Sequence, residues 1–341
     1  MRVAVYYNNK DVRVEERAIP EINDDELLVK VIASGICGTD VMEWYRIKRA
    51  PLVLGHEISG IIEKVGKNVK NFKIGDRVMI SHHVPCMKCH YCLNNHHTAC
   101  ETLHKTNIDP GGFAEYIRIP KINVELGTFK LPENVSFEEG TFAEPLGTVI
   151  RAQRLANLKE NQTLLVIGSG VSGLIHIKLA KAKNVKKIIA VDIDEYRLNA
   201  AKRFGADFVI NANDDIISKL KEINENRLAD LVIVCTGALS AAKQALQCVD
   251  KGGTILFFAV PKPDEKFEIP INDFWRNEVK IMTSYGAALN DLRESLDLIA
   301  SKKINFNDMI THKLKFDGIQ EGFRLVAEAK ESLKVIVEPN K

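Results

Sequence analysis

The sequence predicts an α/β protein with two domains, a β-rich barrel-like domain followed by a doubly wound parallel sheet. Its 341 residues exceed what one hydrophobic core usually serves, which favours two domains. Up to about Pro120 the chain shows short strands broken by turn residues, whereas from Asn161 onward short apolar strands are mostly separated by helical stretches. This alternation of strands and helices in the second part is typical of successive βα units and therefore of a parallel sheet.

In the first domain, residues 1–7 alternate in the manner of an edge strand. Turn residues at Gly75-Asp76 and Pro110-Gly111-Gly112 precede the predicted strands at 77–80 and 113–119. A cysteine-rich excursion lies between these two turns. The remaining expected strands are residues 27–33, 58–65, 77–80 and 113–119.

The second domain is expected to hold six strands. Residues 164–167 and 231–234 are continuous apolar runs, as parallel strands buried on both faces should be. The tail after Thr283 exceeds what six strands need, so we expect it to return to the first domain. The other predicted strands are 187–191, 208–210, 254–259, 279–283 and a last one at 334–337; helices are predicted near 172–183, 291–301 and 318–329.

Four cysteines in a C-x2-C-x2-C-x7-C run predict a structural metal site. This spacing lets four thiolates converge on one tetrahedral zinc from a short irregular lobe. A closed four-thiolate site leaves no open coordination position, so this zinc should stabilise a loop and take no part in chemistry. The predicted ligands are Cys86, Cys89, Cys92 and Cys100.

A second set of ligand types suits a catalytic zinc. Cys37 follows a strand, the Gly55-His56-Glu57 tripeptide forms a tight turn, and Glu144 adds a further carboxylate. A catalytic zinc uses about three protein ligands and keeps one position for water or substrate. A lone histidine or cysteine is usually structural, but the added carboxylates favour the metal interpretation.

The Gly168-Ser169-Gly170-Val171-Ser172-Gly173 turn predicts a dinucleotide site. The motif alone is weak, but here it follows the strand at 164–167 and opens the predicted helix at 172–183. Backbone N–H groups and a helix N-terminus can then face a pyrophosphate. The expected cofactor-binding residues also include Thr236 and Gly237.

Asp192 bears on the choice of cofactor. It ends the next strand, 19 residues after Gly173, where a carboxylate can bind both ribose hydroxyls and repel a 2′-phosphate, which favours NAD. The alternative is that Asp192 only caps the following helix, for which Asp194 is an equally good cap. Arg197, also assigned to the cofactor site, could partly neutralise a phosphate.

Composition excludes several classes of protein. With 45% hydrophobic and 27% charged residues and a net charge of +2, the chain resembles neither a disordered nor a nucleic-acid-binding protein. No apolar segment reaches the ~18 residues that a membrane span needs. The first residues lack the features of a signal peptide, so we expect a cytoplasmic protein. In that compartment the cysteines are expected to bind metal in preference to forming disulfides, except Cys235 and Cys248, which are expected to be buried, inert thiols.

The motifs together resemble those of a known family. The pattern Gly55-His56-Glu57-x2-Gly60-x5-Gly66-x2-Val69 matches the zinc-containing alcohol dehydrogenase signature, and the cysteine lobe and glycine turn follow in that family's order. Over essentially its whole length the chain resembles a medium-chain dehydrogenase/reductase. The resemblance implies a GroES-like catalytic domain at 1–148 with a zinc lobe at 82–104, a Rossmann domain at 149–285, and a tail at 286–341 that completes the catalytic domain.

Within this family, His56-Glu57 together with Glu144-Pro145-Leu146 is similar to the sorbitol and threonine dehydrogenase branch. The resemblance implies Cys37, His56 and Glu144 as principal ligands of the catalytic zinc, with Glu57 exchangeable. It also implies that Thr39 takes the substrate proton. We further expect a homo-oligomer, either a tetramer or a dimer.

The chain departs from that branch at two places. Relatives commonly carry a histidine two residues after the Asp40 position, but this chain has Met42, whose thioether cannot relay a proton. The polyol branch also offers an arginine after the last sheet strand, where this chain reads Ser284-Tyr285-Gly286-Ala287. The second difference argues against a sorbitol-like substrate and indicates no replacement.

These observations predict a zinc-dependent oxidoreductase with two zinc ions per chain. It would transfer a hydride between a secondary alcohol, such as a polyol, diol or hydroxy-amino acid, and NAD, giving a ketone. A catalytically silent sensor that binds NAD and zinc is the alternative, and Met42 favours it. A zinc-independent quinone reductase would not need the ligand set.

Overall fold

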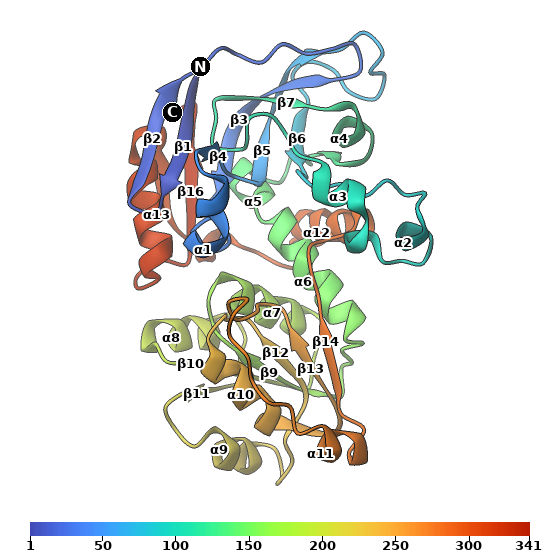
Figure 1. Ribbon diagram of the computed structural model, residues 1–341, viewed down its shortest axis with the longest axis vertical. Coiled ribbons are helices and arrows are strands. Elements are labelled where there is room, and N and C mark those ends of the chain that lie inside the picture. The colour runs from blue at the N-terminus through green and yellow to red at the C-terminus, as the bar shows by residue number, and fades with distance from the viewer. The chain divides into compact units, whose positions relative to one another are not determined.

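The computed structural model describes residues 1–341 and divides into two compact units. Unit 1 comprises Met1–Gly147 and Ala287–Lys341, and unit 2 comprises Thr148–Gly286. Figure 1 shows unit 1 as a β-rich body and unit 2 as a sheet flanked by helices. None of the helices is both long and apolar enough to cross a membrane.

The larger sheet of unit 1 carries the candidate site. Its strands follow the order β15-β16-β3-β5-β6-β8, and β7 pairs with β3 beside this path. Only β15 and β16 are parallel, and the other neighbours are antiparallel. The strands are β3 (Leu27–Gly35), β5 (Glu57–Val65), β6 (Arg77–Ile80), β7 (Tyr116–Ile119), β8 (Thr128–Lys130), β15 (Ile310–Lys315) and β16 (Lys334–Glu338).

A three-stranded sheet holds the beginning of the chain, with β1 (Arg2–Asn8) between β2 (Asp11–Glu16) and β4 (Leu52–Val53). The expectation of an edge strand was therefore wrong, because β1 is the central strand. Its residues from Val3 to Tyr6 are all buried, which shows that both faces of the strand are covered. A tight turn after Asn8 returns β2 along one side, and β4 pairs along the other.

The tail of the chain completes the core of unit 1. All residues of β16 are buried, and Val337 pairs with Ser34 of β3. Helix α13 (Ile319–Glu328) lies beside β2 and β16, as Figure 1 shows. Its Phe323 ring packs 5.7 Å from the ring of Tyr6 and 5.7 Å from that of Phe113. Residues more than 300 positions apart thus share one core.

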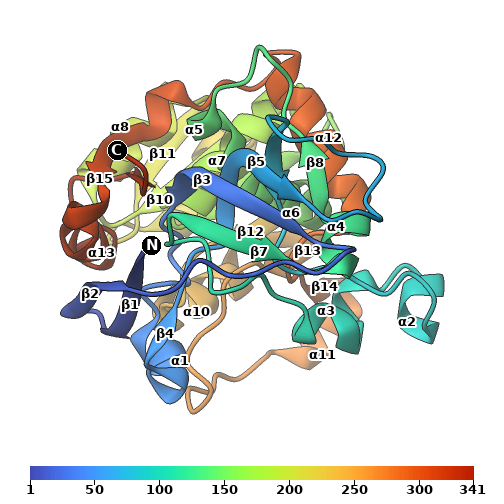
Figure 2. The same cartoon turned by 90° about the horizontal axis from the view of Figure 1, so that it is seen from above.

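Short helices connect the strands of unit 1, and α6 runs from one unit into the next. The cysteine lobe contains α2, η2 and α3, and α2 lies at its outer end in both Figure 1 and Figure 2. The helices are α1 (Glu43–Arg46), η1 (Ile47–Arg49), α2 (His90–Leu93), η2 (His97–Ala99), α3 (Glu101–Lys105), α4 (Lys121–Leu126), α5 (Phe137–Gly140), α6 (Ala143–Leu155), α12 (Leu289–Ala300), η3 (Asn307–Met309) and η4 (Phe316–Gly318).

Unit 2 is the predicted doubly wound sheet, with six parallel strands in the order β11-β10-β9-β12-β13-β14. The order reverses between β9 and β12, and open α/β sheets bind ligands at the carboxyl ends of strands at such a point. The elements are β9 (Thr163–Ile167), α7 (Val171–Ala182), β10 (Lys187–Asp192), α8 (Glu195–Arg203), β11 (Phe208–Asn211), α9 (Ile216–Ile223), β12 (Ala229–Val234), α10 (Leu239–Cys248), β13 (Val249–Phe257), α11 (Ile271–Arg276) and β14 (Lys280–Thr283).

A stacked pair of aromatic rings tests the contribution of the tail to the core of unit 1. Phe142 and Phe306 are fully buried, and their rings stack with centroids 4.4 Å apart. We expect Phe306→Ala to lower the free energy of unfolding of unit 1 by about 3–5 kcal/mol, since it removes buried surface and leaves a cavity. Urea unfolding would measure the loss. The control Phe208→Ala alters a ring that is 42% exposed, and an equal effect of both changes would contradict the prediction.

Candidate active site

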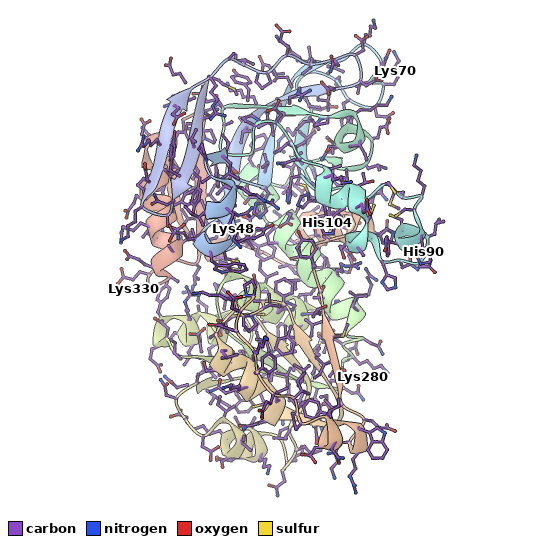
Figure 3. All side chains as sticks on the ribbon, in the orientation of Figure 1. Lys48, Lys70, His90, His104, Lys280 and Lys330 are labelled. Carbon is purple, nitrogen blue, oxygen red and sulfur yellow. The ribbon has the colours of Figure 1, made fainter.

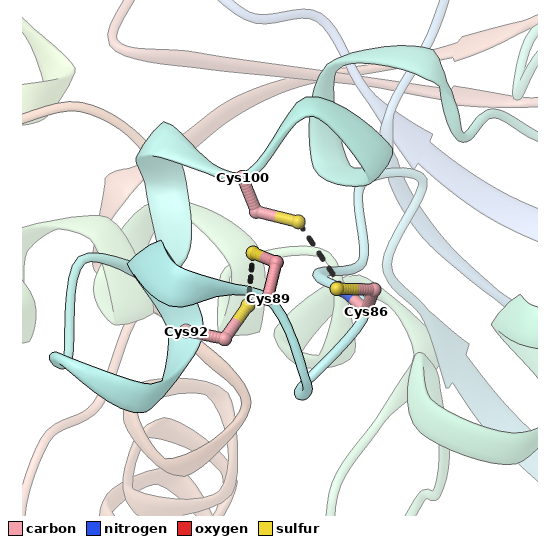
Figure 4. Close-up of side chains that lie close together, drawn as sticks. All are labelled: Cys86, Cys89, Cys92 and Cys100. Carbon is pink, nitrogen blue, oxygen red and sulfur yellow. Dashed lines mark hydrogen bonds between the residues drawn. The ribbon is translucent and has the colours of Figure 1, made fainter.

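The four cysteines of the lobe converge as their spacing predicted. Their sulfur atoms all lie within 4.8 Å of one another, and the Sγ atoms of Cys89 and Cys92 are 3.6 Å apart (Figure 4). Zn–S bonds of about 2.3 Å in a tetrahedron place two sulfurs about 3.8 Å apart, so the geometry fits zinc. Figure 3 labels His90 and His104 on this part of the chain. None of these cysteines forms a disulfide.

The protonation of the thiols also favours a cation at this site. The N–H of Lys88 lowers the pKa of Cys86. Burial acts to raise the pKa of Cys100, but hydrogen bonds, chiefly from the N–H of Cys86, lower it to about 6. Burial raises the pKa of Cys92 to about 12. Without a positive ion the cluster therefore keeps protons, and a bound divalent metal would hold all its members as thiolates.

The second ligand set is assembled by the pairing of β3 with β5. Gly35 at the end of β3 lies opposite Glu57 at the start of β5. This register brings Cys37 and His56, which flank the paired residues, to the same edge of the sheet. The ligand atoms of Cys37, His56 and Glu57 all lie within 4.8 Å of one another. A side chain at Gly35 would collide with the carboxylate of Glu57.

The structure adds Lys334 to this site, a residue that sequence analysis missed. Its ammonium group forms an ion pair with the carboxylate of Glu57, and the two side chains are 0% and 2% exposed. Buried charges are costly unless they are paired, so each of these residues requires the other. The one signal in the sequence was a lysine beginning an otherwise apolar strand.

Glu144 lies near this group without belonging to it. The residue is half-buried near the start of α6, and its carboxylate is not among the atoms within 4.8 Å of one another. Burial raises the pKa of Glu144 to about 7. The negative charge of Glu57 also raises this pKa, whereas the positive charge of His56 lowers it. The carboxyl group therefore shares the electrostatic environment of the ligand set.

Asp40 orients the candidate ligands, a role that the sequence did not reveal. It is fully buried, and its Oδ2 accepts a hydrogen bond of 3.1 Å from the N–H of Cys37. Its Oδ1 lies 3.4 Å from His56 Nδ1. Burial opposes a charged imidazole, but the charges of Asp40 and Cys37 raise the pKa of His56 well above its usual range. A carboxylate in this position commonly fixes the ring of a metal-binding histidine.

Two further histidines, also missed from the sequence, lie beside His56. The ring of His82 is 4.9 Å from that of His56 and 3.8 Å from that of His83. Burial lowers the pKa of His82 well below its usual range and that of His83 to about 4, so both imidazoles are neutral at physiological pH. Asn123 fixes their backbone by donating to the carbonyls of Ser81 and His82, at 2.9 and 3.0 Å.

Thr39 is exposed at the same edge. Its hydroxyl donates to Cys37 Sγ over 3.4 Å, so the candidate proton acceptor lies next to a candidate metal ligand. Met42 is half-buried and precedes α1. A hydroxyl beside an assembled ligand set can exchange a proton with an alcohol bound there.

The glycine turn of unit 2 has the geometry of a phosphate site. Gly168 has φ +96°. Helix α7 begins at Val171 and continues through Ser172, so the N-terminus of this helix faces the turn. A side chain at Gly173 would collide with the carbonyl of Gly168, which excludes any larger residue. Thr236 packs against Gly168, and its hydroxyl accepts from the N–H of Ala238 across Gly237.

Asp192 belongs to this turn. Its Oδ2 accepts a hydrogen bond of 2.6 Å from the N–H of Ser169. The cap of α8 is Asp194, which accepts from the N–H of Arg197, so the alternative that Asp192 only caps this helix is wrong. The guanidinium of Arg197 also reaches the turn, because a Cβ at Gly170 would lie 3.0 Å from its Nη1.

Known proteins share this arrangement. Residues 23–132 match the family model of the alcohol dehydrogenase GroES-like domain, and residues 172–301 match that of zinc-binding dehydrogenases. Sorbitol dehydrogenase of Bacillus subtilis is 31% identical over 353 aligned residues, covering 100% of this chain and 98% of the relative. D-xylulose reductase A of Aspergillus oryzae is 31% identical and covers 96% of this chain and 93% of the relative.

Two similar solved structures contain nicotinamide cofactors. An alcohol dehydrogenase of Escherichia coli complexed with NADH has a TM-score of 0.88, with 27% identity over 99% of both chains. A Sinorhizobium meliloti protein bound to NADP also has a TM-score of 0.88, with 26% identity over 99% of both chains. By sequence, fold and ligand geometry, this chain belongs to the zinc-containing medium-chain dehydrogenase/reductase family of alcohol dehydrogenases.

Proposed function

We propose that the protein is a zinc-dependent dehydrogenase that transfers a hydride between a secondary alcohol and NAD. The observation that carries this proposal is the convergence of Cys37, His56 and Glu57 next to the hydroxyl of Thr39. A binding module would not need a proton acceptor beside its metal ligands. A cysteine, a histidine and a carboxylate are the donor types used by catalytic zinc with an open position.

Each residue of the site has a separable task in this reaction. Cys37 and His56 would hold the zinc, with Glu144 or Glu57 as the oxygen ligand, and the bound ion would supply Lewis acidity toward the alcohol oxygen. Asp40 holds the ring of His56, and Lys334 holds Glu57.

Proton transfer and cofactor binding fall to other residues. Thr39 accepts the proton of the alcohol through its hydroxyl, which lies 3.4 Å from Cys37 Sγ. The glycine turn would hold the pyrophosphate of the cofactor, whose nicotinamide would supply the hydride acceptor.

The proposed substrates are polyols, diols and hydroxy-amino acids. Relatives named for sorbitol and D-xylulose support the polyols, since both names denote secondary-alcohol chemistry on carbon chains with several hydroxyls. The neutral His82 next to His56 adds a polar wall on which a second hydroxyl can bind. A homo-oligomer remains a prediction.

Turnover of secondary alcohols tests the function directly. With zinc-loaded protein and NAD, we expect at least one polyol, diol or hydroxy-amino acid to yield NADH, measured by absorbance. Thr39→Ala should lower kcat by ~10²–10⁴-fold because it removes the proton acceptor, while Thr39→Ser keeps the hydroxyl and most of the activity. A protein that binds zinc and NAD without turning over any alcohol would instead be the sensor.

Two zinc ions of unequal lability are expected for each chain. The four-thiolate site is closed, whereas the site at Cys37 keeps an exchangeable position, so a chelator should remove the second ion first. Metal analysis should find that Cys37→Ser loses only this ion and keeps its melting temperature. Cys92→Ser should lose the other ion and melt earlier. Simultaneous loss of both ions to the chelator would contradict the assignment.

Asp192 should make NAD the better coenzyme. Its carboxylate at the turn repels a 2′-phosphate, so Asp192→Ser should shift the ratio of kcat/KM for NAD and NADP toward NADP by roughly tenfold or more. Asp194→Ser is the matched control, because Asp194 caps α8 and makes no hydrogen bond to the glycine turn. A parent protein that already prefers NADP would show that the role given to Asp192 is wrong.

A further inference from the structure

Arg46 contacts the candidate proton acceptor. This last residue of α1 donates from Nε to the carbonyl of Thr39 over 2.9 Å and from Nη2 to the hydroxyl of Thr39 over 3.3 Å. Its side chain is only 14% exposed, although Thr39 is an exposed residue. The guanidinium is therefore held against Thr39 and does not extend freely into solvent.

The same guanidinium group connects Thr39 with the ligand set. Arg46 Nη2 lies 3.6 Å from Asp40 Oδ1, and that oxygen lies 3.4 Å from His56 Nδ1. Both distances are those of ion pairs without a well-formed hydrogen bond. A continuous series of polar contacts thus runs from the Thr39 hydroxyl through Arg46 and Asp40 to His56.

An aromatic ring supports Arg46. The Cζ atom of Arg46 lies 4.9 Å from the centre of the Tyr45 ring, and that of Arg49 lies 5.5 Å from the same centre. Arg49 is exposed and makes no hydrogen bond to Thr39. Both arginines therefore contact the ring of Tyr45, but only Arg46 forms hydrogen bonds with Thr39.

A purely structural role for Arg46 would be satisfied by its bond to the carbonyl of Thr39. The second bond, from Nη2 to the hydroxyl, reaches the group to which the proposed function assigns the proton of the alcohol. Met42, four residues earlier, can neither donate nor relay a proton. At this site an arginine therefore contacts the candidate proton acceptor Thr39, and position 42 carries a methionine in place of an imidazole.

We propose that Arg46 is the positioning residue of the proton acceptor: it directs the Thr39 hydroxyl at the reacting oxygen and places a permanent positive charge beside it. The proposal rests on the proposed dehydrogenase activity of this site. It assigns to Arg46 a task that Met42 cannot perform.

The proton balance is that of a simple exchange. Arginine is always protonated in proteins, so Arg46 passes no proton. Arg46 donates to one lone pair of Thr39 Oγ1 and so makes the hydroxyl a better proton donor. In one step the hydroxyl turns from Cys37 Sγ and gives its own proton to water, while its other lone pair accepts the proton of the alcohol. Thr39 is unchanged at the end, and because it is exposed, water can reach it.

The test compares Arg46→Met with the matched control Arg49→Met. In zinc-loaded protein we expect Arg46→Met to lower kcat by ~10²-fold, as for a positioned proton-transfer group, with KM for the cofactor nearly unchanged. Arg49→Met should keep kcat. Zinc content and melting temperature should match the parent in both variants, and Arg46→Lys, which keeps the charge, should retain part of the rate.

A double-mutant cycle shows whether Arg46 acts through Thr39. Because the hydroxyl is the only route in the proposal, Thr39→Ala with Arg46→Met should be no slower than Thr39→Ala alone. Added guanidinium chloride at millimolar concentration should partly restore Arg46→Ala. Additive losses, or no rescue together with an unchanged kcat in Arg46→Met, would overturn the proposal.

A readout without turnover separates this proposal from the proposed function. Binding of 2,2,2-trifluoroethanol to the zinc-loaded protein, measured by calorimetry, should weaken about tenfold in Arg46→Met and stay unchanged in Arg49→Met, since only the first variant loses the bond from Nη2 that holds the Thr39 hydroxyl toward the alcohol. Turnover in the parent without any contrast between the variants refutes the role of Arg46 alone. If the variants differ in alcohol binding but the parent shows no turnover, the dehydrogenase is refuted, and Arg46 is left as the residue that positions Thr39 toward a bound alcohol. If neither turnover nor a difference is found, both proposals are refuted.

Discussion

The buried ion pair between Glu57 and Lys334 is the contact on which the candidate site depends. It joins the start of β5 to the start of β16, so the last strand of the chain is fixed to the edge that carries the candidate metal ligands. Both groups would be strongly destabilised alone in the core, which makes the pairing nearly obligatory. The tail therefore supplies a charge to the site as well as apolar surface to the core.

Around this pair, electrostatics divides the site into groups that carry charge and groups that do not. Asp40 lies between the ring of His56 and the guanidinium of Arg46, and its carboxylate keeps both in place. His82 and His83 lie next to them and stay neutral because they are buried. One edge of a sheet thus brings together candidate metal ligands, a candidate proton acceptor and uncharged hydrogen-bonding groups.

The cofactor turn shows how a short motif gains specificity from its surroundings. Any side chain at Gly173 would collide with the carbonyl of Gly168, and the positive φ of Gly168 favours glycine there, so the fold requires two of the three glycines. The hydrogen bond from the N–H of Ser169 to Asp192 joins the turn after β9 to the end of β10, and β9 borders the reversal of strand order. A carboxylate in that position is hydrogen-bonded into the glycine turn.

The sequence by itself determined the features that rest on local spacing. The cysteine lobe, the glycine turn and the apolar strands of unit 2 could be predicted because their chemistry is set by residues close together in the chain. The central place of β1 in its sheet could not be predicted, because β4, which pairs with the second side of β1, lies over 40 positions away in the chain. Lys334, Asp40, Arg46 and His82 became part of the site only in the tertiary structure. Their roles depend on which strand edges and helix ends meet, and in a single sequence a buried lysine or an anchored arginine looks the same as one in solvent.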